Sequence, residues 1–238
     1  IGSIYLLVSI VITNHNYGRF LGNAIRSARK QVFLQDGDWE VLVVEDGSTD
    51  DSKDVIESHR EGVQTIFHDE PHGLPAAINS GIRASTGSYI LRLDADDWLD
   101  SHAAFFLSYF LDNNPEIGFV WPDYHIYNTS DQIIDRISEP QGAGIMFRRQ
   151  LLLDVGLYDE EMLMYEDRDI LLRCAARAPG HHLKLPLYCY KRHEDNMSIK
   201  YDELNLYDEL LNKKHGDEVQ SDLSRVYPGF SGPIAPSQ

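Results

Sequence analysis

The first hundred residues alternate short apolar runs with segments whose apolar residues recur at helical spacing. Residues 4–12 are rich in β-branched side chains, which predicts a strand buried on both faces. Residues 18–31 repeat their apolar positions every three or four residues, which predicts an amphipathic helix. Further strands are expected at 40–44, 63–67 and 88–93, and further helices at 50–60 and 74–84. Such alternation with short connections indicates a parallel sheet with right-handed crossovers, covered by helices.

The second half of the chain shows a less regular pattern. Its expected elements are a helix at 102–113, a strand at 117–121, a hairpin or meander at 124–137, a strand at 143–147, a short helix from Arg149, a helix at 170–176, a strand at 183–190 and a helix at 202–214. From residue 216 onward Pro, Gly and Ser dominate, which predicts a loosely attached tail over 216–238. No linker-like stretch interrupts the rest, so we predict a single domain over residues 1–215.

Polar clusters follow three of the apolar strands in the first half. They are Thr13-Asn14-His15-Asn16, Glu45-Asp46-Gly47-Ser48 and Asp94-Ala95-Asp96-Asp97. The carboxyl ends of parallel strands meet at one edge of a sheet, and ligands of open α/β sheets bind beyond that edge. We therefore expect the three clusters to converge on one binding site.

The charge balance narrows the choice of ligand for that site. The 238 residues include 21 Lys and Arg against 38 Asp and Glu, a formal net charge of −17. This excess argues against nucleic acid as the main partner, because phosphate recognition needs a basic face. It also argues against electrostatic adhesion to an anionic bilayer. A nucleoside diphosphate stays compatible with an acidic protein if a divalent cation bridges the two.

The cysteines and the longest apolar run bear on the compartment. Cys174 and Cys189 are too few for a disulfide framework and lack the spacing of a structural zinc site. Two buried thiols in a reducing compartment are the favoured interpretation, with a single bridge left open. The run at 4–12 is far shorter than the ~20 residues of a membrane-spanning helix and has no basic segment before it. A soluble intracellular protein is therefore expected.

The acidic cluster after the fourth strand has the chemistry of a cation site. Asp94 and Asp96 are two residues apart, so an extended backbone places both carboxylates on the same side. Hard oxygen ligands that leave coordination positions free suit Mg²⁺ or Mn²⁺ shared with a diphosphate. A solvated turn explains an isolated D-x-D equally well in a chain this acidic. The position of this one after an apolar strand favours the metal interpretation.

Six segments along the chain carry a family resemblance. In order they read TNHNYGRFL, VLVVEDGSTDDS, HGLPAAINSGIRASTGSYILRLDADDWL, GAGIMFRR, MYEDRDILLR and YKRHEDNMS. They cover roughly residues 4–200, and the combination of EDGSTD, LDADDWL and a downstream ED is specific. With them the chain resembles the inverting glycosyltransferases of the GT-A type and is most similar to family two, the large group of bacterial polysaccharide transferases.

The resemblance implies a fold and a set of nucleotide contacts. The fold would be a three-layer α/β GT-A domain with a mainly parallel sheet flanked by helices. Residues 1–100 would form its nucleotide-binding half and 101–215 its acceptor-binding half. In that fold Asp46 would bond the base, Asp94 the ribose and Asp96 the metal. The nucleotide-binding positions would be Thr13, Asn14, Asn16, Asp46, Asn79, Arg83, Asp94, Ala95 and Asp96.

The same resemblance implies metal and catalytic roles. The metal, Mn²⁺ or Mg²⁺, would be held by Asp96, Asp97 and His193, with the choice between the two aspartates left open. Asp167, preceded by Glu166, matches the ED motif whose acid is the catalytic base. Chemistry supports both roles, because charge grows on the leaving diphosphate and an acceptor hydroxyl must lose its proton.

Each of these residues also has a simpler interpretation. Glu166 and Asp167 could only stabilise the start of the following helix, where acids are favoured. His193 lies in a charged stretch and could be a solvated surface residue. Trp98 could flank the acceptor sugar or pack against the sheet. The contacts of these residues in the structure are needed to distinguish these alternatives from the roles that the resemblance implies.

The sequence therefore predicts a metal-dependent, inverting, hexosyltransferase-type glycosyltransferase. Its donor would be a nucleotide sugar, with a UDP-sugar favoured by the resemblance, and its acceptor a glycan or lipid-linked glycan. Its location would be cytoplasmic, with peripheral contact at the inner membrane face left open. One alternative is a nucleotide-sugar-binding domain without catalysis, which the joint presence of Asp96 and Asp167 disfavours. The other is a sugar-phosphate nucleotidyltransferase, which the first loop, TNHNYGRF, disfavours.

Overall fold

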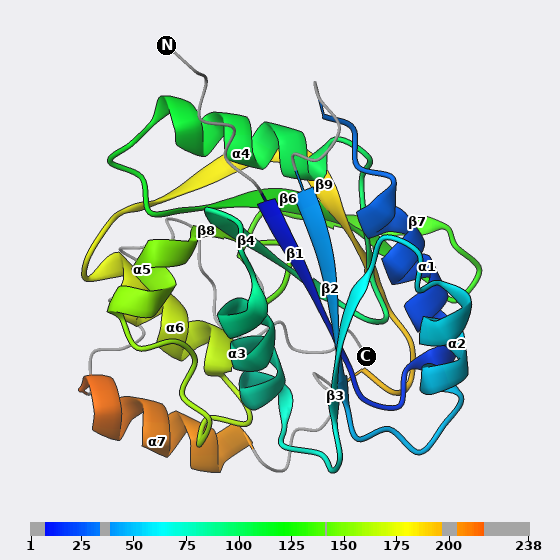
Figure 1. Ribbon diagram of the computed structural model, residues 1–238. Helices are drawn as coiled ribbons and strands as arrows, with labels where there is room; N and C mark the ends of the chain where they lie inside the picture. The colour runs from blue at the N-terminus through cyan, green and yellow to red at the C-terminus, as the bar shows by residue number, and fades with distance from the viewer. Residues whose placement is uncertain (1–7, 34–38, 141, 197–203, 217–238) are drawn as a thin grey trace.

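A single twisted sheet forms the centre of the computed structural model, which describes residues 8–33, 39–140, 142–196 and 204–216. Its strands are β1 (Val8–Asn14), β2 (Trp39–Asp46), β3 (Gln64–His68), β4 (Tyr89–Asp94), β5 (Trp98–Leu99), β6 (Phe119–Tyr127), β7 (Ile133–Ile137), β8 (Met146–Arg148) and β9 (Gly180–Lys191). They lie in the order β3-β2-β1-β4-β8-β6-β9-β5, with β7 paired to β6 (Figure 1). Strands far apart in the sequence thus become neighbours.

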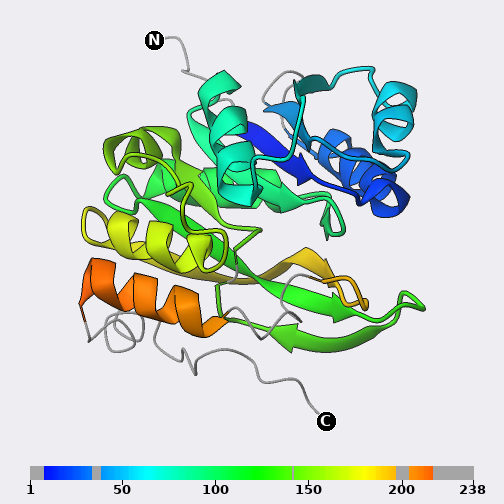
Figure 2. The ribbon, with the colours of Figure 1, turned by 90° about the horizontal axis from the view of Figure 1, so that it is seen from below.

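Helices cover both faces of this sheet. They are α1 (Gly18–Arg29), α2 (Ser52–Ser58), α3 (Leu74–Ala84), α4 (Ala103–Asn113), α5 (Arg149–Asp154), α6 (Glu166–Ala175) and α7 (Leu204–His215). Apolar residues of α1, α2 and α4 pack in one cluster against one face of the sheet. Those of α3, α5, α6 and α7 pack in a second cluster against the other face. Figure 2 shows α5, α6 and α7 side by side. The three-layer α/β architecture expected from the sequence is confirmed.

The direction of the strands determines where the polar clusters meet. Strands β3, β2, β1 and β4 are all parallel. Within the described residues β6 and β9 run the same way, while β5, β7 and β8 run against them, so the sheet is mainly parallel. All seven residues of β1 are buried, as its β-branched sequence predicts. The carboxyl ends of β1, β2 and β4 consequently share one edge.

Several element boundaries differ from the sequence-based expectation. Strands β1, β2 and β4 extend through Asn14, Asp46 and Asp94, so these polar residues belong to the sheet and not to the loops after it. Helix α6 begins at Glu166, earlier than expected, and the two-residue strand β5 was not expected. An apolar pattern ends a predicted strand at its last apolar residue. Backbone hydrogen bonds to the neighbouring strands keep the polar residues that follow in the strand as well, so the pattern did not indicate these extensions.

Some expectations fall on residues outside the described ranges. These include the first residues of the strand expected at 4–12, the start of the helix expected at 202–214 and nearly all of the tail at 216–238. Cys174 and Cys189 are both buried and free. Across the described part of the chain, the helices are too short or too polar to span a bilayer.

Candidate active site

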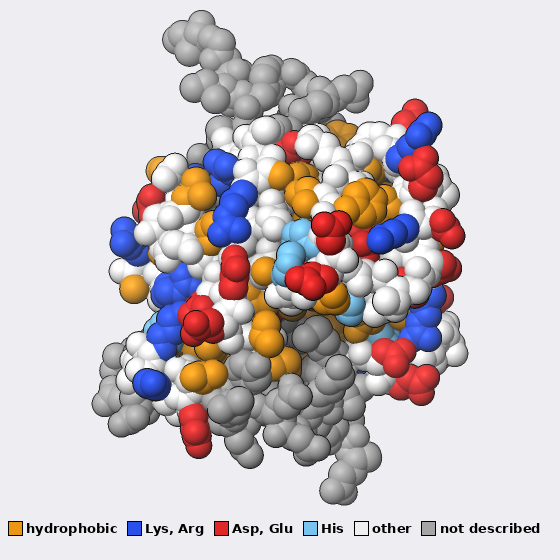
Figure 3. All heavy atoms as spheres, turned by 60° about the horizontal axis from the view of Figure 1, so that its bottom comes forward, with side chains coloured by type: hydrophobic (Ala, Val, Ile, Leu, Met, Phe, Trp, Pro, Cys, Tyr) orange, Lys and Arg blue, Asp and Glu red, His pale blue; other side chains and the backbone are white. Residues whose placement is uncertain are grey.

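The site lies at the edge of the sheet where β1, β2 and β4 end. Thr13 of β1 is in register with Asp94 of β4, and Asn14 of β1 with Glu45 of β2. Figure 3 views the molecule with the lower end of Figure 1 turned forward, and acidic and histidine side chains gather near the middle of this face. The register of parallel strands therefore brings the three polar clusters together, as expected.

The loops after β1 and β2 are joined by hydrogen bonds. Asn16 adopts a left-handed backbone conformation with φ of 60°. Its backbone N donates to Ser48 Oγ at 2.9 Å, and its side-chain Oδ1 accepts from the backbone N of Thr49 at 2.8 Å. Asp50 Oδ2 accepts from the backbone N of Gly18 at 2.9 Å, at the start of α1. Asn16 therefore fixes the shape of this edge through its own backbone and side chain.

Asp46 is held by several donors at the end of β2. Its Oδ1 accepts from the backbone N of His72 and its Oδ2 from the backbone N of Gly73, both at 2.9 Å. His68 Nδ1 forms a third hydrogen bond to Oδ1 at 2.6 Å, and His68 Nε2 lies 3.0 Å from Ser80 Oγ. Gly73 has φ of 91°, a conformation that favours glycine. Each carboxylate oxygen has two lone pairs, so Oδ2 retains one for a ligand.

Three buried polar atoms at this edge have no hydrogen-bond partner among the described residues. They are Thr13 Oγ1, Asn14 Oδ1 and Glu45 Oε2. Asn14 Nδ2, by contrast, donates to Ser48 Oγ at 3.2 Å. Buried polar atoms in folded proteins are nearly always bonded to protein, water or a ligand. Their concentration at the strand ends is what a polar ligand site requires.

The two candidate metal aspartates have different surroundings. Asp97 is buried, its Oδ2 accepts from the Tyr188 hydroxyl at 2.7 Å and its Oδ1 from the backbone N of Lys191 at 2.8 Å. Burial, together with the charges of Asp96 and Asp94, raises the pKa of Asp97 well above its usual range. Both oxygens of Asp97 therefore link the turn after β4 to β9.

Asp96 points to a different partner, the loop after β9. Its Oδ2 lies 3.0 Å from His193 Nε2 and accepts from Asn196 Nδ2 at 3.1 Å. His193 is only 6% exposed and stacks on Phe20 of α1 with ring centroids 4.5 Å apart, so it is not a solvated surface residue. This separation is that of a hydrogen bond, and Asn196 Nδ2 also lies 3.1 Å from His193 Nε2. Asp96 and His193 thus bring a carboxylate oxygen and an imidazole nitrogen side by side, two donor types that divalent cations accept.

A second group of potential ligands involves Asp46. The ligand atoms of Asp46, His68 and His72 lie within 4.8 Å of one another. The sequence did not single out His68 and His72, because neither shows ligand spacing. In this structure the His68 nitrogens already contact Asp46 and Ser80. This arrangement orients the Asp46 carboxylate.

Asp94 and Glu166 share one arginine. Arg92 Nε donates to Asp94 Oδ1 and Arg92 Nη1 to Glu166 Oε1, both at 2.9 Å. Burial raises the pKa of Glu166 to about 7, although Arg92 favours its charged form. Burial also raises the pKa of Asp94, against the effect of Arg92. Asp94 interacts electrostatically with both Asp96 and Asp167. The metal candidate and the ED motif thus lie around one carboxylate.

The ED motif occupies the first turn of α6. Tyr165 precedes the helix with φ of 58°, a rare conformation for a residue with a side chain. Glu166 is buried, whereas Asp167 is partly exposed and accepts only a local bond, from the backbone N of Arg168 at 2.8 Å, among the contacts of the described residues. The two acids therefore differ: Glu166 is a buried partner of Arg92, and Asp167 is accessible to a substrate.

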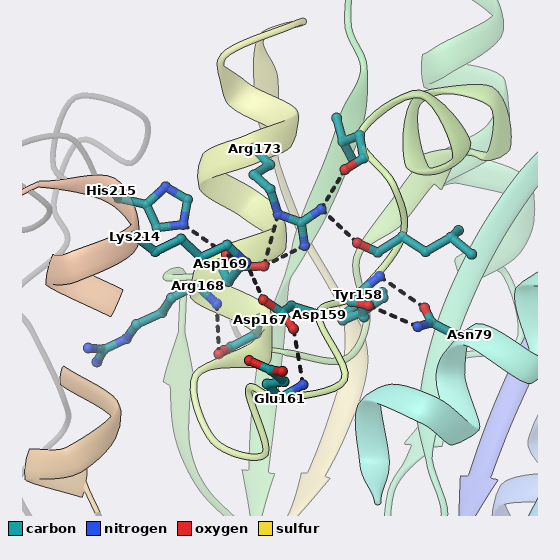
Figure 4. Close-up of polar contacts among 12 residues, drawn as sticks. Asn79, Tyr158, Asp159, Glu161, Asp167, Arg168, Asp169, Arg173, Lys214 and His215 are labelled. Atoms are coloured by element: carbon teal, nitrogen blue, oxygen red, sulfur yellow. Dashed lines mark hydrogen bonds and ion pairs between the residues drawn. The ribbon is translucent and has the colours of Figure 1, made fainter. Parts of the chain in front are cut away.

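Helix α7 is bonded to α6, the helix that carries the ED motif (Figure 4). Asp169 Oδ1 lies 2.7 Å from Lys214 Nζ and 2.8 Å from His215 Nε2, and Asp169 Oδ2 accepts from Arg173 Nε at 2.9 Å. Asp169 is fully buried, and these bonds lower its pKa although burial opposes them. Lys214 and His215 therefore fasten α7 to the helix that carries the ED motif, and Arg173 of that same helix completes the basic surroundings of the carboxylate.

Asn79 and Arg83, expected to border the nucleotide, contact other protein groups. Asn79 is buried in α3; its Nδ2 donates to the Tyr158 carbonyl and its Oδ1 accepts from the Tyr158 backbone N, both at 2.9 Å. Asn79 Nδ2 also donates to Glu160, and the exposed Arg83 lies 3.5 Å from the same Glu160. Both residues connect α3 to the segment that leads into α6. Ala95, in the turn after β4, is buried.

Other members of the site had no distinctive signal in the sequence. Arg92 lies inside an apolar strand, and Tyr188 and Asn196 are far from the D-x-D motif in the chain. Trp98 lies in the short strand β5, and its ring packs against that of Tyr127 at the end of β6, with ring centroids 4.6 Å apart. Periodicity alone does not indicate these contacts; the pairing of β5 with β9, for example, brings Trp98 beside the strand that carries Tyr188.

Comparison with curated proteins gives relatives that are named as glycosyltransferases or as a polysaccharide synthase. One is the UDP-Glc:α-D-GlcNAc-diphosphoundecaprenol β-1,3-glucosyltransferase WfgD of Escherichia coli, 29% identical over 137 residues, which are 57% of this chain and 52% of the relative. The matched regions span between 30% and 52% of the length of the first curated relatives. This chain thus corresponds to part of each of them.

Solved structures with the same fold bind nucleotide sugars. TarS 1-349 of S. aureus in complex with UDP-GlcNAc is similar with a TM-score of 0.75 and 17% identity, covering 93% of this chain and 71% of that one. The mannosyltransferase PcManGT of Pyrobaculum calidifontis, in complex with GDP-Man and Mn²⁺, is similar with a TM-score of 0.68 and 14% identity, covering 95% and 76%. These similarities confirm the GT-A fold.

The family model for glycosyl transferase family 2 matches residues 9–164, well over half of the chain. The match includes the polar ends of β1, β2 and β4 and stops two residues before α6. This chain belongs to glycosyl transferase family 2.

Proposed function

We propose that this domain is a metal-dependent, inverting glycosyltransferase that moves a sugar from a nucleotide-diphosphate donor to a hydroxyl acceptor in glycan or polysaccharide synthesis. The observation that carries the proposal is that Arg92 bonds both Asp94, at the end of the strand before the metal candidate Asp96, and Glu166, the neighbour of the ED residue Asp167. Leaving-group stabilisation and proton removal need groups on opposite sides of the reacting carbon. This edge of the sheet supplies both.

The donor nucleotide would occupy the ends of β1, β2 and β4. Asp46 Oδ2 has a lone pair for a base N–H, and the unpaired atoms of Thr13 and Asn14 would accept or donate further bonds. Asp94 would contact the ribose, with Ala95 beside it in the turn. Asn16 would act by shaping the loop. A UDP-sugar is the favoured donor, supported by the substrate in the name of WfgD and by UDP-GlcNAc in the TarS complex.

The cation, Mn²⁺ or Mg²⁺, would be held by Asp96 and His193. When bound, it would neutralise the negative charge that grows on the leaving diphosphate. Asp97, whose two oxygens are already bonded to Tyr188 and Lys191, would act by fixing the turn that presents Asp96. The sequence left the choice between the two aspartates open, and these bonds favour Asp96.

Asp167 would serve as the catalytic base. It is partly exposed and, among the described residues, accepts only a local bond, whereas Glu166 is buried against Arg92. Asp167 lies in the first turn of α6, beside Glu166. Asn79 and Arg83 would support the base indirectly, by holding the segment before α6 against α3.

The acceptor would be a glycan or lipid-linked glycan bound by the second half of the domain, residues 101–215. The diphosphoundecaprenol acceptor in the name of WfgD supports a lipid-linked substrate. Such an acceptor would bring the domain to the cytoplasmic face of the membrane as a peripheral protein. Nucleic acid is not among the proposed partners, because the net charge is −17.

Calorimetry with UDP in the presence and absence of Mn²⁺ tests the proposal, followed by hydrolysis assays with UDP-glucose and UDP-N-acetylglucosamine. We expect Mn²⁺-dependent UDP binding and slow release of UDP from at least one donor. A domain that binds UDP but never releases it from a donor, even with glycan acceptors present, would instead be a nucleotide-sugar-binding module. Failure to bind either UDP or GDP with Mn²⁺ would overturn the proposal.

A further inference from the structure

Arg92 is a cation inside an otherwise apolar strand. It lies in β4 between Leu91 and Leu93, and its side chain is only 4% exposed. A buried charge is costly unless it is paired and hydrogen-bonded. Strand geometry places Arg92 on the same face of the sheet as Asp94, which is the next residue but one. The strand thus places a guanidinium directly beneath the edge where the ligand site lies.

The guanidinium uses its two edges for two different carboxylates. Nε at 2.9 Å and Nη2 at 3.3 Å donate to the two oxygens of Asp94, while Nη1 donates to Glu166 at 2.9 Å. Burial opposes the charged form, but the two carboxylates raise the pKa of Arg92 well above its usual range. Asp94 ends a strand of the first half of the chain, and Glu166 begins α6 in the second half. One rigid, planar group therefore connects the two halves of the site.

The segment after residue 141 surrounds this connection closely. A Cβ on Gly142 would lie 3.0 Å from Arg92 Nη1 and 3.3 Å from the Asp167 Cβ. The backbone N of Gly144 donates to the Arg92 carbonyl at 2.9 Å. Arg92 and the first turn of α6 therefore pack against the same stretch of backbone, which leaves little room for either to move alone.

We propose that Arg92 is a positioning residue that couples the donor site to the catalytic base. Through Asp94 it orients the carboxylate at the nucleotide, and through Glu166 it orients the turn of α6 that presents Asp167. The inference rests on the proposed function and adds to it a residue that contacts neither nucleotide nor metal. A change at the donor site is transmitted to the base through a single side chain.

The planar fork of arginine is essential to this role. A lysine ammonium keeps the charge but carries all its N–H donors on one nitrogen, so it cannot bond both carboxylates in the same geometry. Arg92→Lys therefore separates the two functions of the residue, charge and geometry. The matched control is Arg173→Lys, which makes the same change to a largely buried arginine that bonds Asp169 farther along α6.

The test measures the Kd for UDP with Mn²⁺, and kcat and KM for hydrolysis of UDP-glucose and UDP-N-acetylglucosamine, each normalised to folded protein. Arg92→Lys is expected to raise both Kd and KM and to lower kcat, each by about tenfold, as loss of one charge-assisted bond on either side predicts. Arg173→Lys is expected to lower the melting temperature and to leave Kd and KM unchanged.

A second variant covers a failure of Arg92→Lys to fold. Arg92→Gln combined with Glu166→Gln removes both charges of one buried pair, a change that folded proteins tolerate better than removal of one partner. Compared with Glu166→Gln alone, the double variant should bind UDP about tenfold more weakly, since Asp94 loses its partner.

The outcomes separate this inference from the proposed function. A wild-type protein that binds no UDP overturns the proposed function and the role of Arg92 with it. A wild-type protein that binds UDP, together with an Arg92→Lys variant of unchanged Kd, KM and kcat per folded molecule, overturns the role of Arg92 alone. A double variant that binds UDP as tightly as Glu166→Gln also overturns the role of Arg92 alone.

Discussion

The hydroxyl of Tyr188 donates a hydrogen bond to Asp97 Oδ2 at 2.7 Å, across 91 residues of sequence. The bond joins β9 to the turn that carries the D-x-D motif, and both side chains are buried. The third aspartate of the motif therefore serves the shape of the turn, while the second faces His193. This division yields a prediction for Tyr188.

Tyr188→Phe removes the hydroxyl and leaves Asp97 Oδ2 buried without this donor. We expect unfolding in urea to show a loss of about 1–3 kcal/mol, the cost of an unsatisfied buried acceptor. Mn²⁺-dependent UDP binding should weaken as well, because the turn that presents Asp96 is less restrained. Tyr109→Phe, at an exposed position on α4, is the control and should change stability by less than about 0.5 kcal/mol. Equal stability of the two variants would contradict the role of Asp97 in fixing the turn.

Removal of the cation tests Asp96 and His193. EDTA should lower the affinity of the wild-type domain for UDP by at least about tenfold, since the ion bridges two anionic partners. In Asp96→Asn the affinity should be low with or without Mn²⁺, because a metal ligand is lost. Asp135→Asn, at an exposed position of β7, should respond to EDTA as the wild type does. An EDTA effect of wild-type size in Asp96→Asn would assign the ion to other residues.

The raised pKa of Glu166 predicts a pH-dependent stability. Its ordinary pKa of 4.5 applies in the unfolded chain, whereas burial raises the pKa to about 7 in the folded protein. Between these values the folded state binds more protons than the unfolded state, so stability is greatest below the lower pKa and falls as the pH rises through 7. Glu166→Gln lacks this titration. From about pH 4 to about pH 8 the wild type should lose about 3 kcal/mol relative to the variant, at 1.4 kcal/mol per pKa unit.

Chemical denaturation of both proteins at a series of pH values measures this difference. Glu61→Gln, at an exposed site, is the control and should follow the wild-type curve. A difference between wild type and Glu166→Gln that is constant with pH would show that the pKa of Glu166 is the same in the folded and the unfolded protein.

Replacing Asp169 should strongly lower the stability of the domain, although Asp169 is not among the residues proposed to bind the ligand. Asp169→Asn leaves Arg173, Lys214 and His215 without their shared carboxylate, and breaking a buried pair costs about 3–5 kcal/mol. Lys214→Met should cost less, because Lys214 is partly exposed and Asp169 keeps two other partners. Asp154→Asn, at the exposed end of α5, is the matched control. Thermal unfolding should rank the three variants in this order, and equal melting temperatures would contradict the central role of Asp169.

Much of the donor side could be predicted from sequence because local rules determine it. Strand–helix alternation predicted the three-layer fold, and the parallel sheet predicted that Asp46 and Asp94 would meet at one edge. The acidic motif and the later ED segment were visible as patterns in the chain. Nucleotide-sugar binding by these residues stays a prediction, which calorimetry with UDP and Mn²⁺ tests.

The contacts that distinguish similar residues could not be predicted, because they come from distant segments. Asp96 and Asp97 are neighbours in sequence, and only the pairing of β5 with β9 brings Tyr188 and Lys191 to one of them. Arg92 resembles an ordinary strand residue until Glu166, 74 positions later, is placed beside it. Long-range pairing therefore determines which of the two aspartates is bonded to β9 and which faces His193.

The bonds from Asp169 to α7 also determine where the polypeptide can be truncated without loss of stability. Lys214 and His215 lie some 45 residues beyond Asp169, so a polypeptide ending shortly after β9 would retain the buried carboxylate and lose two of its three basic partners. Such a fragment would contain all the residues proposed for chemistry and still have a weakened core beneath the ED motif. Expression boundaries for this domain should therefore lie beyond His215.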